Sequence, residues 1–66
     1  MTTSQDKLRL LRLPEVKQMT GLSKSSIYLR IASGTFPKQI LLGPRVVAWS
    51  EHAVKTWIQS QIDAAA

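Results

Sequence analysis

Lysine, serine, tyrosine and arginine side chains are concentrated in the run SKSSIYLR, residues 23–30. Two further basic residues, Lys38 and Arg45, lie on either side of a short apolar segment. Ammonium, guanidinium and hydroxyl groups are the donors with which proteins bind phosphate oxygens. These residue types therefore favour the binding of a polyanion over the making or breaking of a covalent bond.

Residue types suited to catalysis are scarce in this chain. His52 is the only histidine and there is no cysteine, so a metal site would depend on one imidazole and distant carboxylates. The serines lack a G-x-S-x-G or Ser/Lys motif, and the glycines form no nucleotide-binding pattern. We expect no catalytic residue, no metal and no cofactor, which makes a very small enzyme the weakest of three alternatives.

Charge is distributed unevenly along the 66 residues, whose net charge is +5. Eight of the nine basic residues but only one of the four acidic residues lie in residues 7–45, a local net charge of +7. A surplus confined to one part of a small domain predicts an anionic partner, most commonly nucleic acid. The absence of cysteine and of an apolar run of about 20 residues predicts a cytoplasmic protein with no membrane partner.

Two short helices are predicted in the first half of the chain. Pro14 suits the first position of a helix that runs to Thr20, and Gly21 closes it. Ser23 is placed to cap a second helix, which Gly34 and the following proline end. Two helices separated by about three residues, with glycine in the turn, have the spacing of a helix-turn-helix.

The second helix is predicted to bury only a narrow apolar stripe. At 100° per residue Ile31 falls close to Ile27, whereas Leu29 falls on the opposite face together with two serines. The expected partners of that stripe are Val16, Met19 and Leu22. The outer face is then free to enter a groove.

A hairpin is predicted after the second helix, with strands at residues 39–42 and 46–49 around the turn GPR. Beside a helix-turn-helix such a hairpin is a wing. Its Arg45, near the tip, is expected to reach a phosphate or the minor groove, the alternative being an ordinary surface arginine.

Ser50 is the expected cap of a third helix, residues 51–63, and Trp49 is expected in the core together with one helix face. The residues of that face are Val54, Trp57, Ile58 and Ile62. The predicted fold is mostly α with a small β-hairpin, a winged helix-turn-helix of three helices with a two-stranded wing between helices two and three. We expect a disordered arm at residues 1–7, the domain at 8–63 and a frayed tail at 64–66.

The motifs GLSKSSIY, GTFPK and LGPR, followed by a tryptophan and a capped helix ending in WI, extend over residues 8–58. In this succession the chain resembles the AlpA-type phage and prophage regulators, small winged helix-turn-helix proteins related to excisionases and to the DNA-binding half of MerR-like activators. The resemblance implies a sequence-specific DNA binder in the bacterial cytoplasm, associated with the nucleoid, that regulates transcription or assists excision of a mobile element. Double-stranded DNA is then the partner, with further copies of the chain on repeated sites and a recombinase or integrase as additional candidates.

The chain departs from the family pattern beside Tyr28. Members often carry arginine and then a bulky apolar residue there, whereas this chain has Leu29 and then Arg30; Gln39 also replaces a frequent second proline. Leu29 is expected either to touch a thymine methyl group or to pack under the wing.

Three hypotheses follow: a DNA binder with helix two in the major groove, a protein-interaction module that binds a recombinase or signalling partner, and the very small enzyme. The first is favoured because the basic residues and the motifs coincide. An exposed apolar patch around Leu29 and the wing would favour the second. The residues expected to contact DNA are Ser23, Lys24, Ser25, Ser26, Tyr28, Leu29, Arg30, Lys38 and Arg45.

Overall fold

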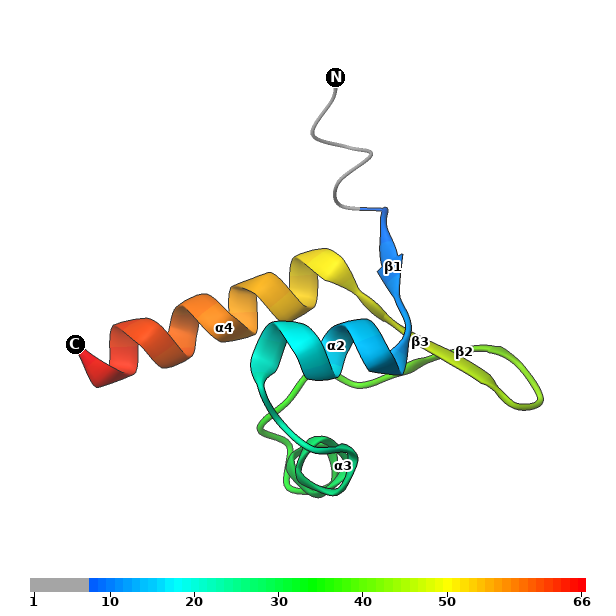
Figure 1. Ribbon diagram of the computed structural model, residues 1–66, viewed down its shortest axis with the longest axis horizontal. Helices are drawn as coiled ribbons and strands as arrows, with labels where there is room; N and C mark the ends of the chain where they lie inside the picture. The colour runs from blue at the N-terminus through cyan, green and yellow to red at the C-terminus, as the bar shows by residue number, and fades with distance from the viewer. Residues whose placement is uncertain (1–7) are drawn as a thin grey trace.

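A computed structural model describes residues 8–66 of the chain, with three helices and a small antiparallel sheet (Figure 1). The elements are, in chain order, β1 (Leu10–Leu11), α2 (Leu13–Thr20), α3 (Lys24–Ala32), β2 (Ile40–Gly43), β3 (Val46–Ser50) and α4 (Glu51–Ala65). The hairpin of β2 and β3 lies between α3 and α4, which confirms the predicted winged helix-turn-helix. The arm predicted at residues 1–7 lies outside the described residues, and the domain limits stay predictions.

Local signals in the sequence explain where the first helix begins and ends. α2 starts at Leu13, one residue before the predicted Pro14, because Arg12 is the extended residue at its N-terminus. The Glu15 carboxylate accepts the backbone N–H of Arg12 at 3.0 Å and so caps the first turn. At the other end Gly21 adopts a left-handed conformation, φ 74°, and donates its N–H to the carbonyl of Lys17 at 2.8 Å.

The sheet contains a third strand that the sequence did not predict. Its order is β1-β3-β2, and β1 pairs with β3 through Leu10 opposite Ser50 and Leu11 opposite Trp49. A segment of only two residues has no periodicity of its own, so it becomes a strand only because β3 supplies the partner. Through this pairing the chain before α2 is held against the base of the wing.

The core lies between the sheet and the helices. It consists of Leu11, Val16, Ile27, Phe36, Trp49 and Val54. Trp49 is fully buried, as predicted, whereas Trp57 is half-buried beside Phe36 and donates its indole N–H to the carbonyl of Thr35 at 2.6 Å. The prediction that Ile62 belongs to the core face is wrong, because its side chain is 57% exposed. The last turns of α4 extend past the sheet, where no described element covers them (Figure 1).

Candidate DNA interface

The turn between α2 and α3 is stiffened by its own side chains. The hydroxyl of Thr20 donates to the carbonyl of Val16 at 2.8 Å and accepts the backbone N–H of Leu22 at 3.2 Å. Together with the left-handed Gly21, these bonds determine the angle at which the chain leaves α2. The second helix is thereby presented at a defined orientation to the first.

The N-terminus of α3 combines a cap with free donors. The hydroxyl oxygen of Ser23 accepts the backbone N–H of Ser26 at 3.2 Å, and the carbonyl of Ser23 accepts that of Ile27 at 3.0 Å. Lys24 and Ser25 follow in the first turn with exposed side chains. Among the predicted site residues Ser23 therefore has a structural role, and Lys24 and Ser25 are free to meet a ligand at a helix end that attracts anions.

The middle of α3 is anchored to the core from one side only. Ile27 is fully buried, and the half-buried ring of Tyr28 packs edge-on against Trp49. On the other side Leu29 is 71% exposed and Arg30 is exposed. The alternative in which Leu29 packs under the wing is therefore wrong, and this side chain belongs to the outer face of the helix.

The two predicted wing residues lie at opposite ends of the hairpin. Arg45 is exposed in the turn that joins β2 to β3, next to Pro44, and Lys38 is exposed two residues before β2 begins. Proline restricts the backbone of the turn, so the guanidinium of Arg45 is presented from a rigid tip. Lys38 projects from the base of the hairpin on a flexible side chain whose ammonium is less preorganised than a planar guanidinium.

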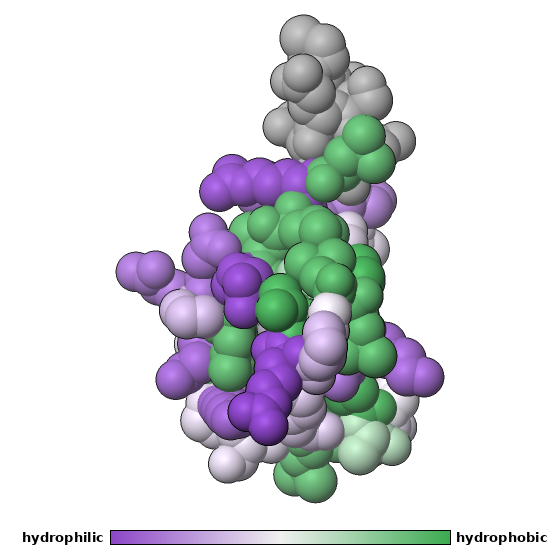
Figure 2. Space-filling model, turned by 90° about the vertical axis from the view of Figure 1, so that its right-hand side faces the viewer, coloured by the Kyte–Doolittle hydropathy of each residue, from purple (hydrophilic) through white to green (hydrophobic). Residues whose placement is uncertain are grey.

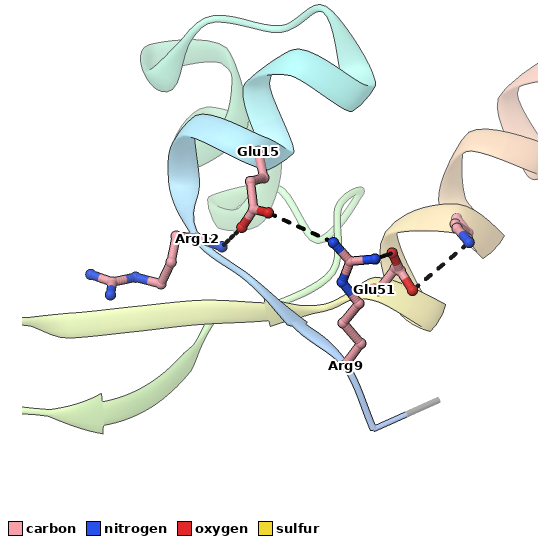
Figure 3. Close-up of polar contacts among 5 residues, drawn as sticks. Arg9, Arg12, Glu15 and Glu51 are labelled. Atoms are coloured by element: carbon pink, nitrogen blue, oxygen red, sulfur yellow. Dashed lines mark hydrogen bonds and ion pairs between the residues drawn. The ribbon is translucent and has the colours of Figure 1, made fainter. Parts of the chain in front are cut away.

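Two basic side chains of the protein are neutralised by ion pairs with carboxylates. Arg9 lies 3.2 Å from the carboxylate of Glu51 and 3.9 Å from that of Glu15, so the residue before β1 links α2 and α4 through one guanidinium (Figure 3). Lys55 lies 3.8 Å from the same Glu51. Arg9 and Lys55 therefore form ion pairs within the protein. In the sequence analysis Arg9 was one of the basic residues that give residues 7–45 their positive net charge.

Two basic residues that sequence reasoning did not single out have properties expected of a DNA contact. Arg12 and Lys17 are exposed, and within residues 8–66 neither has a carboxylate within 4.0 Å of its charged group. The side chain of Arg12 points away from Glu15 and Glu51 (Figure 3). The only signal for either residue in the sequence was its membership of the basic region.

Potential metal ligands are dispersed in the described part of the chain. His52 is exposed in the first turn of α4, and residues 8–66 contain no group of three or more potential metal ligands. In the same residues no helix combines the length and apolar character needed to span a bilayer.

A turn that joins α2 to α3, a capped second helix with a free outer face and a hairpin with a basic tip define a winged helix-turn-helix protein. The family model described as prophage CP4-57 regulatory protein (AlpA) matches residues 9–62. The chain belongs to this AlpA family of regulatory proteins, which are not enzymes.

Two curated relatives show the same relationship. The chain is 46% identical over 54 residues to uncharacterized protein ORF88 of Enterobacteria phage P4, an alignment that covers 82% of this chain and 61% of that protein. It is 38% identical over 60 residues to the DNA-binding transcriptional activator AlpA of Escherichia coli (strain K12), covering 82% of this chain and 86% of that protein. The chain thus spans about three-fifths of the length of the phage relative and most of the length of the bacterial one.

Proposed function

We propose that this protein binds double-stranded DNA sequence-specifically and activates transcription for a prophage-like element. The observation that carries the proposal is the outer face of α3, where exposed basic, hydroxyl and apolar side chains occupy a helix held by the buried Ile27. The E. coli relative, whose printed name is that of a DNA-binding transcriptional activator, supports the same function.

In the proposed complex α3 lies in the major groove and the wing lies on the backbone or in the adjacent minor groove. Lys24 and Ser25 contact phosphates or base edges at the start of α3, and Leu29 contacts a thymine methyl group farther along. Arg45 contacts the backbone or minor groove from the tip of the hairpin. Arg12 and Lys17 add positive charge that holds the duplex without selecting its sequence.

Binding by several copies is part of this proposal. A single module of this size buries only about 600–1,000 Å² on DNA, which limits the specificity that one copy attains. Several copies bound to repeated sites would supply the additional specificity.

Footprinting of the full chain on the DNA of its own locus tests the proposal. We expect protected segments at a promoter, and the number and spacing of these segments give the number of copies. Protection confined to recombination sites would instead indicate an excision complex. Absence of protection on any duplex, at salt concentrations low enough for phosphate contacts to form, would overturn DNA binding.

One observation favours a second candidate function alongside the first. Leu41 is 75% exposed and Leu42 is 52% exposed on the wing, beside the basic residues proposed to meet DNA. Exposed neighbouring leucines are typical of a surface that binds protein. The hairpin is therefore also a candidate docking surface for a protein partner.

A further inference from the structure

The second strand exposes three consecutive apolar side chains, which we name the wing strip: Ile40, Leu41 and Leu42. Their exposed fractions are 40%, 75% and 52%. Ile40 and Leu41 are in regular register with Ala48 and Val47, so their side chains point to opposite faces and their joint exposure means that β2 is open on both faces. Leu42 lies in a bulge between Leu41 and Gly43. Figure 2 looks onto the side of the molecule towards which the hairpin projects in Figure 1, and it shows a continuous apolar band bordered by polar groups.

The backbone of β2 is open as well. In the order β1-β3-β2 this strand forms an outer edge, and its only pairing partner within residues 8–66 is β3. Ile40–Gly43 contains no charged residue and no proline, so its protection against edge pairing is limited to its short length and to a bulge between Leu41 and Gly43. The strand therefore offers unpaired N–H and C=O groups together with apolar side chains, the combination that binds an added strand.

Charge at the ends of β2 decides which partner fits. Lys38 precedes the strand by two residues and Arg45 follows it by two, both exposed and, within the described residues, without a carboxylate within 4.0 Å. Antiparallel pairing of two copies centred on Leu41 and Leu42 would bring Lys38 of each copy towards Arg45 of the other at the ends of the paired strands, and like charges that approach each other there destabilise the pairing. A second copy is therefore a poor partner for this edge.

DNA is also a poor match for the wing strip itself. Specific DNA interfaces are polar and positively charged, whereas the three side chains of the strip carry no hydrogen-bond donor. A protein segment whose apolar centre is flanked by acidic residues complements both the strip and the two cations at its ends.

We propose that the edge of β2 binds an extended apolar segment of a partner protein, flanked by acidic residues, as a fourth strand of the sheet. This inference rests on the proposed function, because an activator held on DNA by α3 needs a separate surface for the protein that it recruits. The segment runs antiparallel or parallel to β2 over the four residues of that strand. Since Arg45 and Lys38 also serve the proposed DNA contact, Leu41 is the informative position.

Peptides of defined sequence test the docking surface on the full chain by fluorescence anisotropy. The probe has the sequence EEVTVIVTEE, with both ends blocked; one control replaces every glutamate with lysine, and the other replaces the central isoleucine with proline. We expect the acidic-flanked peptide to bind and each control to bind at least about tenfold more weakly. Equal binding of the lysine-flanked peptide would overturn the proposal.

A matched pair of variants locates the binding site. Leu41→Lys places a charge in the wing strip, whereas Leu29→Lys places the same charge on an equally exposed leucine of α3. We expect Leu41→Lys to weaken binding of the acidic-flanked peptide by at least about tenfold, and Leu29→Lys to leave it unchanged. Unchanged binding by Leu41→Lys, or equal weakening by both variants, would overturn the proposal. Lys38→Glu should weaken binding of the same peptide and improve that of the lysine-flanked control.

Binding of the same variants to a footprinted duplex separates this inference from the proposed function. We expect Leu41→Lys to retain its DNA affinity while Leu29→Lys alters which sequence is bound. If Leu41→Lys loses duplex binding together with peptide binding, the wing strip belongs to the DNA interface and the docking proposal is overturned, while DNA binding stands. If the peptide results hold and no duplex is bound, the proposed DNA function fails and the docking surface stands.

Discussion

The ring of Tyr28 packs edge-on against the indole of Trp49, with their centroids 6.2 Å apart and their planes at 67°. Tyr28 belongs to α3 and Trp49 to β3, the strand that continues into the wing. This aromatic contact therefore couples the helix proposed for the major groove to the hairpin proposed for the backbone. The relative placement of the two parts of the candidate DNA interface therefore depends in part on this contact, alongside the packing of Ile27 in the core.

Substitutions at Tyr28 should separate the packing of its ring from the role of its hydroxyl. Tyr28→Phe keeps the ring against Trp49, so we expect an unchanged melting temperature and a loss of about 1 kcal/mol in DNA affinity if the hydroxyl contacts the duplex. Tyr28→Ala removes the half-buried ring and should lower the free energy of unfolding by about 2 kcal/mol. Thermal unfolding and a duplex titration measure the two effects. Unchanged affinity for every sequence, in both Tyr28→Phe and Ser25→Ala, would contradict the role of α3.

Leu29→Arg should change base preference without harming the fold. The side chain is 71% exposed, so an arginine there stays in solvent and the melting temperature should remain that of the parent protein. An arginine in the major groove favours guanine, whereas leucine favours the thymine methyl group. Selection from a randomised duplex pool should therefore show a shift towards guanine. An identical selected consensus for both proteins would show that position 29 does not face the bases.

Arg45→Ala should weaken binding to cognate and random duplexes by similar factors, because a contact to phosphate carries no sequence information. The slope of log affinity against log salt concentration should fall by about one for one lost phosphate contact. Lys38→Ala should act in the same direction but less strongly. The matched control is Lys55→Ala, which removes one positive charge that is paired with Glu51 on α4. If the control lowers the slope as much as Arg45→Ala does, the effect reflects net charge rather than the wing.

Arg9→Ala should lower stability rather than DNA affinity. The Glu51 side chain is only 8% exposed, and the guanidinium of Arg9 at 3.2 Å is nearer to it than the ammonium of Lys55. Removing Arg9 leaves a largely buried carboxylate with a weaker partner, and we expect a loss of about 1–2 kcal/mol in the free energy of unfolding, limited by the exposure of Arg9 itself. Urea denaturation measures it.

The double variant Arg9→Ala with Glu51→Gln tests the cause of that loss. The amide carries no charge to bury, so part of the lost stability should return. If the double variant is less stable than Arg9→Ala alone, the carboxylate contributes through bonds other than its pairing with Arg9.

The sequence by itself determined the helix boundaries of the helix-turn-helix and the position of the wing. Pro14, Gly21, Ser23 and Ser50 act on the backbone within a few residues of themselves, through a restricted φ, a left-handed turn or a side-chain cap. Signals of such short range can be recognised in the sequence without knowledge of the rest of the fold. The buried face of α3 was predictable for the same reason, since helical periodicity alone places Ile27 opposite Leu29.

Only the tertiary structure decided which residues are covered and which charges are free. β1 exists because β3 lies beside it. Ile62 is exposed because α4 extends beyond the sheet, although the spacing of Ile62 along the helix matches the core face. Arg9 is bound by two carboxylates from separate elements, and the wing strip is open because nothing among residues 8–66 pairs with the far edge of β2. Each of these outcomes depends on segments distant in the chain coming together, and the periodicity of a single segment carries no information about its neighbours in space.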